Sequence, residues 1–401
     1  KKKTLRLIGF FLLLFIGVLT LWIVIHKKKK RALKQQQQKI RTLTVKRMFY
    51  EVRGDFTYTV VNEGFMLKFK PFPLQTHNIP TGYAFIPETF ILSIPKGRAQ
   101  EKSPSIITSE VNGTRYAVLD FFWPCEACEG PPGVSKSACE AIKGRVAALP
   151  GLGASNYYHW MVDILPKLKM LQDAHVEYDW LYVTVDPKLP FEKRTLELLG
   201  VDFNKVINSI EHPNIEADLL IAPSFPSAPL YSPRWVIDYL RSEMFSRVRP
   251  ATINLSKKVF ISRNKSNYRQ ISNEEDLFNR LKDIGFQRYY LEDLSVDDQI
   301  QLFAHADQIV APHGAGLANL IFCKPGTAVV EIFQMLEDET FCYLSQILEL
   351  RYTCVATMDF NSPRQVGGYK KSTELSSENI EAIMHAVNNT PSLNDSPFLV
   401  R

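Results

Sequence analysis

The spacing of apolar and polar residues separates an N-terminal apolar segment and a basic stem from a longer patterned region. Residues 7–25, LIGFFLLLFIGVLTLWIVI, contain no charge and are long enough to cross a bilayer core as one helix. We expect a transmembrane anchor here, preceded by a short tail, 1–6, and followed by a basic stem, 26–47. A secretory signal peptide is the alternative, but no cleavage site of small residues follows the run.

The rest of the chain alternates between strand and helix patterns. Short alternating runs such as FMLKFK predict β-structure up to about residue 110. Beyond it, we expect strands at 115–123, 180–185, 218–223, 257–262, 287–291, 308–312 and 327–333. We expect amphipathic helices at 157–171, 193–200, 232–245, 274–285 and 295–306.

Local residue chemistry marks several helix ends. Ser232 is expected to cap the helix that has Pro233 at its first position. Ser272 and Glu275 match a capping box for the helix that follows them. Gly285 is expected to end that helix, because glycine readily adopts the left-handed conformation found there.

Repeated strand–helix units predict an α/β fold with two doubly wound, Rossmann-like domains facing across a cleft. We expect the N-terminal domain over 48–250 and the C-terminal domain over 251–365, joined near VRPATINLSK, 248–257. A helix and tail are expected over 366–401. In such folds a ligand binds at the C-terminal ends of the strands.

The charge distribution argues against a nucleic-acid-binding protein. Residues 1–47 contain 14 of the 48 Lys and Arg residues and no acidic residue. The remaining 34 basic and 42 acidic residues give residues 48–401 a net charge of −8, although the whole chain carries +6. A nucleic-acid binder is expected to have a basic folded domain instead.

Sequons and cysteines favour a lumenal position for the region after the anchor. N-x-[ST] sequons, the candidates for N-glycosylation, occur at Asn112, Asn254, Asn264, Asn388 and Asn394. Six cysteines suit an oxidising compartment, although the spacing of one cluster leaves disulfide and metal binding open; its members are Cys125, Cys128 and Cys139. The lysine-rich stem favours the opposite orientation under the positive-inside rule.

The stretch APHGAGLANLIF, 311–322, joins a buried strand to a helix. Its glycines let the chain turn sharply and let a ligand approach the main chain closely. Unpaired amides at the start of a helix suit an anion such as a phosphate. The candidate ligand-binding residues are His313, Gly314, Ala315, Gly316 and, one turn later, Asn319. A tight turn without a ligand is the alternative.

Three charged residues elsewhere are candidates for the same site. Glu331 lies in an apolar strand past the glycines, where the analogous acid of dinucleotide folds binds ribose hydroxyls. A structural ion pair with a neighbouring Arg or Lys is the alternative for this buried carboxylate. Arg263 ends a strand and Arg269 follows in a loop, and guanidinium groups suit phosphate oxygens.

The stretch NYYHWMVDILPK contains a candidate general base. His159 and Asp163 are four residues apart and share one face of the predicted helix. A carboxylate beside an imidazole fixes its tautomer and raises its basicity. Asn156, Tyr157 and Trp160 surround the pair and are candidates for contacts with an acceptor sugar. A histidine with a core or capping role is the alternative.

Several enzyme classes lack their motifs in this sequence. There is no G-x-S-x-G nucleophile elbow, no G-x-x-x-x-G-K-[ST] loop and no H-E-x-x-H metal motif. A Rossmann-type oxidoreductase is disfavoured because no G-x-G-x-x-G follows a strand. There is also no D-x-D motif to hold a metal and a diphosphate, so a fixed frame of Arg, His and helix amides would have to neutralise a leaving diphosphate.

These motifs in this order, NYYHWMVDILPK, FISRNKSNYRQISNEE, APHGAGLANLIF and VVEIF, resemble glycosyltransferase family 61. That family includes plant β-1,2-xylosyl- and arabinosyltransferases and animal O-linked N-acetylglucosaminyltransferases of the secretory pathway. The likeness runs from about Asn156 to Phe333. It implies a GT-B architecture, inversion at the anomeric carbon, and no obligatory metal or other cofactor.

The resemblance also implies roles for the matching residues. The implied donor-site residues are His313, Gly314, Gly316, Asn319 and Glu331, with Arg263 and Arg269 near the diphosphate. Ala318 stands where the family often has Thr, so one hydroxyl contact is absent here. His159 and Asp163 match a segment that faces the cleft, and which of them is the base is left open.

We therefore expect a membrane-anchored, inverting glycosyltransferase with a lumenal domain in the Golgi or endoplasmic reticulum. The donor would be a UDP-sugar of the xylose, arabinose or N-acetylglucosamine class, and the acceptor a glycan or protein hydroxyl. The alternative is a membrane-tethered glycan-binding or scaffold protein on the same fold, without catalysis.

Overall fold

The computed structural model describes most of the patterned region of the chain. The described residues are 40–43, 55–68, 83–101, 106–107, 115–118, 139–149, 155–228, 230–333, 338–357 and 372–389. The predicted anchor and most of the stem lie outside them, and so do four residues singled out above: Asn112, Asn394, Cys125 and Cys128. Across these described ranges, no helix is long and apolar enough to cross a membrane.

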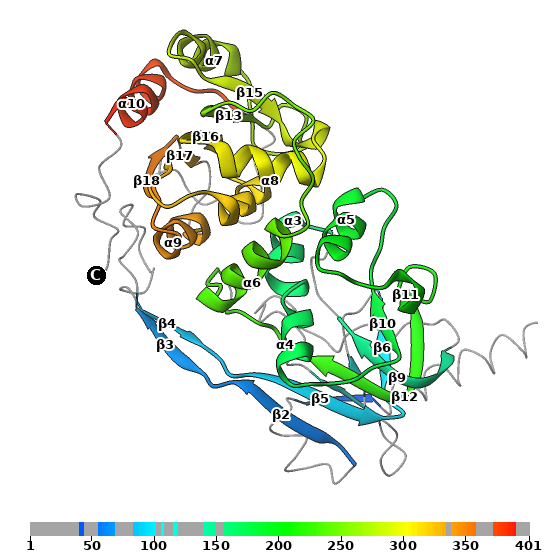
Figure 1. Cartoon of the computed structure of the whole chain (residues 1–401). Coiled ribbons are helices and arrows are strands. Elements are labelled where there is room, and N and C mark those ends of the chain that lie inside the picture. The colour runs from blue at the N-terminus through cyan, green and yellow to red at the C-terminus, as the bar shows by residue number, and fades with distance from the viewer. Residues whose placement is uncertain are drawn as a thin grey trace, which may run out of the picture.

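A ten-stranded mixed sheet forms the N-terminal half of the described chain (Figure 1). Strands β9, β10, β11 and β12 run parallel, and β12 also pairs antiparallel with β5 and β6. Its strands are β1 (Ile40–Leu43), β2 (Thr57–Asn62), β5 (Thr89–Pro95), β6 (Arg98–Gln100), β7 (Ile106–Ile107), β8 (Arg115–Val118), β9 (Glu140–Ala148), β10 (Trp180–Val183), β11 (Val206–Asn208) and β12 (Asn214–Pro223).

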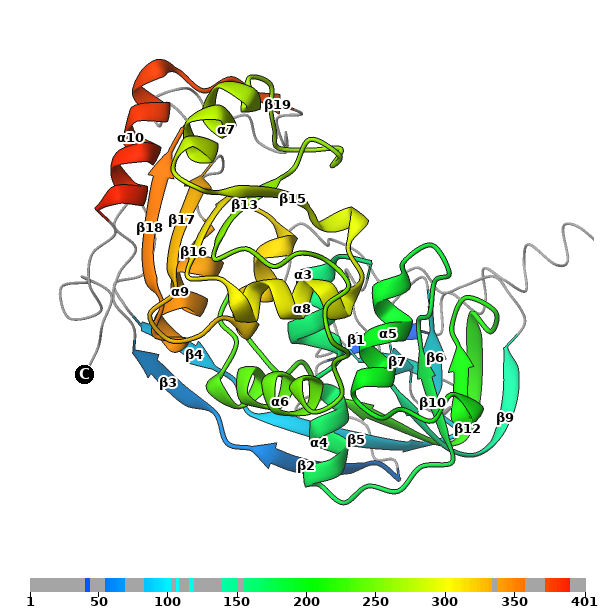
Figure 2. The same ribbon diagram turned by 45° about the horizontal axis from the view of Figure 1, so that its top comes forward.

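A five-stranded parallel sheet forms the C-terminal half, in the order β15-β13-β16-β17-β18 (Figure 2). Its strands are β13 (Lys258–Ser262), β15 (Gln287–Tyr290), β16 (Gln308–Pro312), β17 (Ala328–Phe333) and β18 (Arg351–Ala356). Two small two-stranded sheets complete the described strands: β3 (Phe65–Lys68) with β4 (Tyr83–Ile86), and β14 (Gln270–Ile271) with β19 (Ser372–Thr373).

The described helices pack mainly around these two sheets. They are α3 (Tyr157–His159), the π-helix η2 (Trp160–Ile164), α4 (Lys167–Asp173), α5 (Pro190–Leu198), η3 (Phe203–Lys205), α6 (Arg234–Phe245), α7 (Glu274–Asp283), η4 (Leu291–Asp293), α8 (Val296–His305), η5 (Ala315–Phe322), α9 (Thr340–Ile347) and α10 (Ser377–Asn388). Helices α7 and α10 cover one face of the C-terminal sheet, and α8, α9 and η5 cover the other. This half is therefore doubly wound, as the alternating pattern predicted.

The N-terminal half departs from that prediction. One face of its sheet packs against α4, α5 and α6. The core on the opposite face, which includes Phe90, Leu92, Ile94 and Tyr182, draws only on strands and the residue before β2 within the described ranges. The added strands β5 to β7 come from the Phe- and Pro-rich region, whose alternating runs predicted β-structure but not its place in this sheet.

Two of the predicted helix caps are wrong. Helix α6 begins at Arg234, and Pro233, with an extended ψ of 155°, is the residue before it, so Ser232 lies outside the helix. Asn273 precedes α7, and the Ser272 amide donates to the Thr373 carbonyl at 2.9 Å instead of forming a capping box. The predicted stop at Gly285 is confirmed by its φ of +93°.

The predicted helix over 157–171 is interrupted. Pro166 has no N–H to donate to the Val162 carbonyl, and the chain passes through the π-helix η2 before α4 begins. The Ser227 hydroxyl lies 3.3 Å from the Val162 carbonyl oxygen but closer, at 2.9 Å, to Asp163 Oδ1. The π-turn changes which residues share one face of the helix, but His159 and Asp163 remain in contact.

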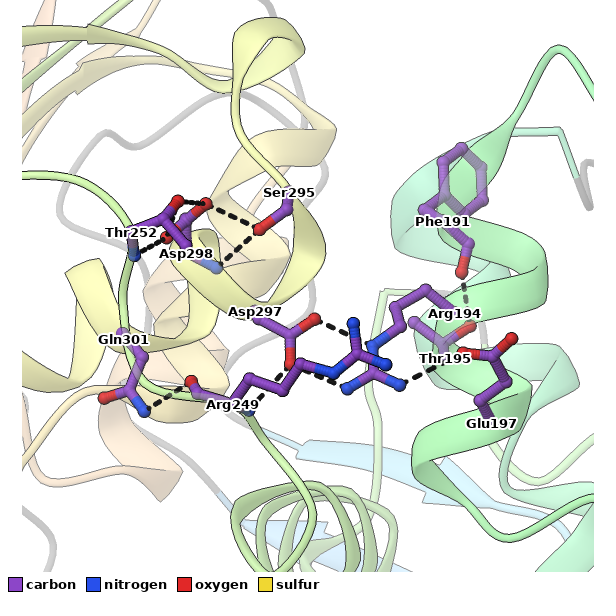
Figure 3. Close-up of polar contacts among 10 residues, drawn as sticks. All are labelled: Phe191, Arg194, Thr195, Glu197, Arg249, Thr252, Ser295, Asp297, Asp298 and Gln301. Carbon is purple, nitrogen blue, oxygen red and sulfur yellow. Dashed lines mark hydrogen bonds and ion pairs between the residues drawn. The ribbon is translucent and has the colours of Figure 1, made fainter.

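The two halves meet through polar contacts at the start of α8 (Figure 3). Asp297 accepts two hydrogen bonds from the Arg194 guanidinium on α5, both at 2.7 Å, and a third from the Arg249 amide at 2.8 Å. Asp298 accepts from the Thr252 amide at 2.7 Å. The first turn of α8 thus binds both α5 and the joint between the halves.

We predict that Asp297→Ala lowers the free energy of unfolding by about 2–4 kcal/mol. The substitution leaves the Arg194 guanidinium, which is mostly buried, without its bidentate partner. Urea unfolding measures the loss. Asp238→Ala is the matched control, because Asp238 forms an exposed pair with Arg234 and its removal should change stability by less than about 0.5 kcal/mol. Equal losses in the two variants would contradict the prediction.

Candidate functional site

Two cavities meet at the turn after β16. The first, of about 240 Å³, lies at the C-terminal ends of β13, β15 and β16 and includes Tyr157, Phe191, Arg263, Glu292 and Gln299 in its wall. The second, of about 180 Å³, includes Asn156, His159, Arg269, His313 and Asp338. Gly314 and Ala315 line both cavities, so the turn forms the boundary between them.

Gly314 is required by the close approach of Arg263. Its φ of 162° is an extended conformation that any residue adopts, so backbone freedom is not the reason for glycine. A Cβ atom at Gly314 would lie 2.0 Å from Arg263 Nη1, which is well inside van der Waals contact. The turn therefore holds a guanidinium directly against its backbone, at the edge of the first cavity.

The two arginines bring positive charge to both sides of this turn. Arg263 lines the first cavity and donates from Nη2 to the Ser266 hydroxyl at 2.9 Å, while its buried Nε has no hydrogen-bond partner among the described residues. Burial and the neighbouring Arg269 charge lower the pKa of Arg263 to about 10. Arg269 lines the second cavity and has a φ of +59°, an uncommon conformation for a residue other than glycine. An anion between the two guanidiniums would relieve their repulsion.

His313 is held between two carboxylates. Its Nδ1 lies 2.5 Å from Glu331 Oε1, and its Nε2 lies 3.2 Å from Asp338 Oδ2. Burial alone would lower the pKa of His313, but Glu331 and Asp338 outweigh it and raise the pKa to about 9. For Asp338, the hydrogen bond and charge of His313 outweigh burial and lower the pKa to about 2. The site therefore contains a fixed imidazolium.

Glu331 does not occupy the ribose-binding position that the sequence predicted. It is 1% exposed, and its second oxygen accepts from the Tyr352 hydroxyl at 2.6 Å. Both carboxylate oxygens are engaged inside the sheet, and Glu331 lines neither cavity. Its observed role matches the alternative of a structural ion pair, although with a histidine instead of Arg or Lys.

The acid in the first cavity is Glu292, which the sequence analysis missed. It follows β15, the strand beside β13. The sequence signal was an acidic residue directly after the strand pattern QRYYL. The glycines predicted an acid on the strand after the turn, whereas the spacing of residues does not reveal that the edge strand β15 lies beside β13.

Asn319 supports the first cavity from behind. It is fully buried; its Oδ1 accepts from the Tyr157 hydroxyl at 2.8 Å, and its Nδ2 donates to Gln299 Oε1 at 2.8 Å. Tyr157 and Gln299 both line the cavity, but Asn319 does not. The sequence predicted that Asn319 reaches toward a ligand. Instead, Asn319 contacts and orients Tyr157 and Gln299, which line the cavity.

Gly316 also has a packing role. A Cβ atom there would lie 2.6 Å from Leu291 Cδ1, so the glycine lets the turn pack against the end of β15. The turn continues into η5, a 3-10 helix, where an ordinary helix was predicted. Ala315 lines both cavities beside it.

His159 and Asp163 form the predicted pair. His159 Nδ1 lies 2.8 Å from Asp163 Oδ2, and the Ser227 hydroxyl lies 2.9 Å from Asp163 Oδ1. The His159 side chain is 16% exposed and lines the second cavity, whereas Asp163 lines neither. Because Nδ1 is engaged by Asp163, Nε2 is the nitrogen suited to exchange a proton with a ligand.

The three predicted acceptor-side residues lie in different places. Asn156 lines the second cavity and caps α3, with Oδ1 accepting from the Tyr158 amide. Tyr157 lines the first cavity. Trp160 is fully buried and donates from Nε1 to the Thr195 hydroxyl at 2.7 Å, so its assignment to a sugar contact is corrected to a core role.

The remaining candidate sites within the described residues are the sequon asparagines and the cysteines. Asn254, Asn264 and Asn388 are exposed, which is compatible with N-glycosylation but does not test it. Asn264 follows Arg263 directly. Cys323, Cys342 and Cys354 carry free thiols, and Cys139 is exposed and forms no disulfide with another described cysteine.

We predict that the stability of the protein falls between about pH 6.5 and 9 because of His313. A pKa raised by folding gives stabilisation that is full below pH 6.5 and lost as the pH rises through 9, on the order of 3 kcal/mol for this shift. His313→Gln should remove this part of the pH dependence in urea unfolding at pH 6, 8 and 9.5. His385→Gln, at an exposed histidine of α10, is the control and should follow wild type. The same slope in His313→Gln and wild type would refute the assignment.

Known proteins share sequence with the part of the chain that builds these cavities. The family model described as Glycosyltransferase 61 matches residues 157–330. The EGF domain-specific O-linked N-acetylglucosamine transferase of Mus musculus is 27% identical over 100 residues, which are 24% of this chain and 19% of the relative. The protein of the same name from Canis lupus familiaris is 34% identical over 92 residues, 22% of this chain and 17% of the relative. The match thus spans about a fifth of the length of these relatives.

A solved structure of the dodecameric iron-containing heptosyltransferase TibC in complex with ADP-D-beta-D-heptose is similar at 10% identity and a TM-score of 0.27. The similarity covers 70% of this chain and 78% of that chain.

The family match includes His159 and Asp163 at one end and stops one residue before Glu331. The resemblance to glycosyltransferase family 61 that the four motifs predicted is confirmed over residues 157–330.

Proposed function

We propose that this chain is an inverting glycosyltransferase that moves a sugar from a UDP-sugar to a hydroxyl of a glycan or protein. The observation that carries the proposal is the pair of cavities that share Gly314 and Ala315, with Arg263 in one and Arg269 in the other. A nucleoside diphosphate sugar has three parts in the matching order. The flat base and ribose would lie in one cavity, the dianionic diphosphate at the shared turn, and the sugar in the other cavity.

The first cavity suits the nucleoside. Tyr157 and Phe191 present aromatic surface, and their rings meet edge to face with centroids 5.2 Å apart. Gln299 Oε1 accepts from Asn319 and retains a second lone pair for a donor of the base, and Glu292 offers a carboxylate that can accept from ribose hydroxyls. We propose that uridine binds here, with its diphosphate against Gly314 and Ala315.

The diphosphate would leave as an anion, and its growing charge must be neutralised. Arg263 and Arg269 supply two guanidiniums, and backbone amides of the turn supply further donors. We propose that this fixed positive frame makes a metal unnecessary. The 3-10 geometry of η5 does not alter this role, because the guanidiniums provide most of the charge.

The second cavity suits the sugar and the reacting hydroxyl. Asn156, Asp338 and Thr340 provide donors and acceptors for sugar hydroxyls. His159 would take the acceptor's proton at Nε2 as the acceptor oxygen bonds to the anomeric carbon and the bond to the diphosphate breaks. Asp163 would hold Nδ1 and stabilise the imidazolium. Attack from the side opposite the diphosphate inverts the anomeric carbon.

The remaining parts of the proposal concern architecture and location. A GT-B arrangement is supported by two separate sheets whose helices border the cavities. We also propose two domains that divide near residue 250, where the chain passes from one sheet to the other. The apolar run 7–25 and the sequons support a membrane-anchored protein with a lumenal domain in the Golgi or endoplasmic reticulum.

We predict that UDP raises the unfolding temperature of the purified protein and that Arg263→Ala abolishes the shift. A ligand at a hundred times its Kd adds about 2.7 kcal/mol to the stability of the folded state. GDP, CDP and NAD should give smaller shifts. Lys265→Ala is the matched control, because Lys265 lies in the same loop but pairs with Asp293 and lines neither cavity. Absence of a shift with any nucleotide would favour a tethered binding protein without catalysis.

We predict that His159→Ala lowers kcat by about a hundredfold or more while UDP binding is retained. Removal of a general base costs about 10²–10⁴ in rate, and His159 lies in the second cavity, away from the nucleoside. UDP release is measured with UDP-xylose, UDP-arabinose and UDP-N-acetylglucosamine, with glycan and glycopeptide acceptors. Wild-type turnover in the variant would show that His159 is not the base.

A further inference from the structure

The hydrogen bonds behind the first cavity determine which atom of Gln299 can bond to a ligand. Gln299 Nε2 donates to two main-chain carbonyls, that of Leu291 at 3.0 Å and that of Leu294 at 3.3 Å. A carbonyl oxygen can only accept, so the amide nitrogen lies on that side and Oε1 lies on the other. Oε1 then accepts from Asn319 Nδ2 at 2.8 Å. The Gln299 amide is therefore held in one orientation, and its two N–H groups have two acceptors.

The amide of Asn319 is oriented by the same rule. Its Nδ2 also donates to the Gly316 carbonyl at 3.2 Å, so Oδ1 lies on the opposite side, where it accepts from the Tyr157 hydroxyl at 2.8 Å. A tyrosine hydroxyl has one proton, and this bond uses it, so Tyr157 can offer a ligand only a lone pair. Main-chain carbonyls thus fix the hydrogen-bond polarity of two side chains in the wall of the first cavity, Tyr157 and Gln299.

The other polar side chains in this wall are acceptors as well, with one exception. The Ser262 hydroxyl uses its proton on the Glu274 carboxylate at 2.7 Å, and Glu292 contributes a carboxylate. Among the described residues that line the first cavity, Arg263 is the side chain that can only donate, and it lies against the turn where we place the diphosphate. The remaining side chains offer acceptors, so a matching nucleoside must supply donors.

We propose that Gln299 selects uracil over cytosine, because the lone pair that Asn319 leaves open on Oε1 accepts from the ring N3–H of uracil. The proposal rests on the proposed function, which places uridine in this cavity. Cytosine has a lone pair at the same ring position, so two acceptors would face each other and both would stay unsatisfied. A site built to receive an N–H strongly rejects a ligand that lacks it. Asn319 is the positioning residue, because its Nδ2 holds Oε1 in place.

The test is isothermal titration calorimetry of the purified full chain with UDP, CDP and N3-methyl-UDP. N3-methyl-UDP keeps the uracil ring and both of its carbonyls but has no ring N–H, and CDP lacks the ring N–H without any added bulk. We expect each of them to bind the wild-type protein at least about tenfold more weakly than UDP, the loss expected when one hydrogen bond is removed and its acceptor is left unpaired.

Two variants assign the preference to Gln299. Gln299→Met removes the acceptor and keeps a side chain of similar length, so the Kd of CDP should come to lie within about threefold of the Kd of UDP. A general loosening of the site would instead weaken both nucleotides equally and keep their ratio. Gln301→Met is the matched control, because Gln301 lies on the same helix, donates to the Arg249 carbonyl at 3.1 Å and lines neither cavity. Its ratio should equal that of wild type.

The outcomes separate this proposal from the proposed function. Equal binding of UDP and CDP to the wild-type protein would overturn the selection and leave the UDP-sugar proposal standing, even if Gln299→Met does not fold. A preference for UDP that persists in a folded Gln299→Met variant would overturn the assignment to Gln299. No binding of any of the three nucleotides would overturn both proposals. A preference that is lost in Gln299→Met and kept in Gln301→Met would support both.

Discussion

The contact between the Arg263 guanidinium and the backbone of Gly314 determines the layout of the site. Because no side chain stands between them, the end of β13 and the turn after β16 are held at one point. The two cavities then open on either side of that point, each with one arginine. Any side chain at residue 314 would push Arg263 into the first cavity and separate the charge from the turn.

This contact is stable only because neighbouring residues fix the turn in place. His313 directly follows β16 and fixes the start of the turn. Its amide donates to the Ile332 carbonyl at 3.0 Å, and its imidazolium pairs with Glu331 from the next strand. Asn319 fixes the other end, where it joins Tyr157 from the N-terminal half to Gln299 from the C-terminal half. The polar side chains of the turn, His313 and Asn319, are therefore mostly engaged inside the protein. The ligand-facing surface is contributed by residues that these contacts orient.

The sequence predicted the C-terminal half well because its information is local. Four predicted strands with clear apolar runs and the amphipathic helices between them were enough to predict a doubly wound parallel sheet, although its fifth strand, β18, was not predicted. The contact predicted between His159 and Asp163, four residues apart, is also present, although a π-helix interrupts the predicted helix. The errors concern long-range contacts. Glu331 was expected at a ribose but is buried inside the sheet, and Trp160 was expected at a sugar but is buried in the core. Neither strand order nor the partner of a buried polar group can be read from spacing.

The internal contacts of the site also explain why it can work with few exposed charges. Positive charge that faces the cavities comes from Arg263 and Arg269; burial and the neighbouring Arg269 charge lower the pKa of Arg263 to about 10, and an anion between the two guanidiniums would oppose that shift. His313, which also borders the second cavity, is held between the carboxylates of Glu331 and Asp338 and is therefore already paired.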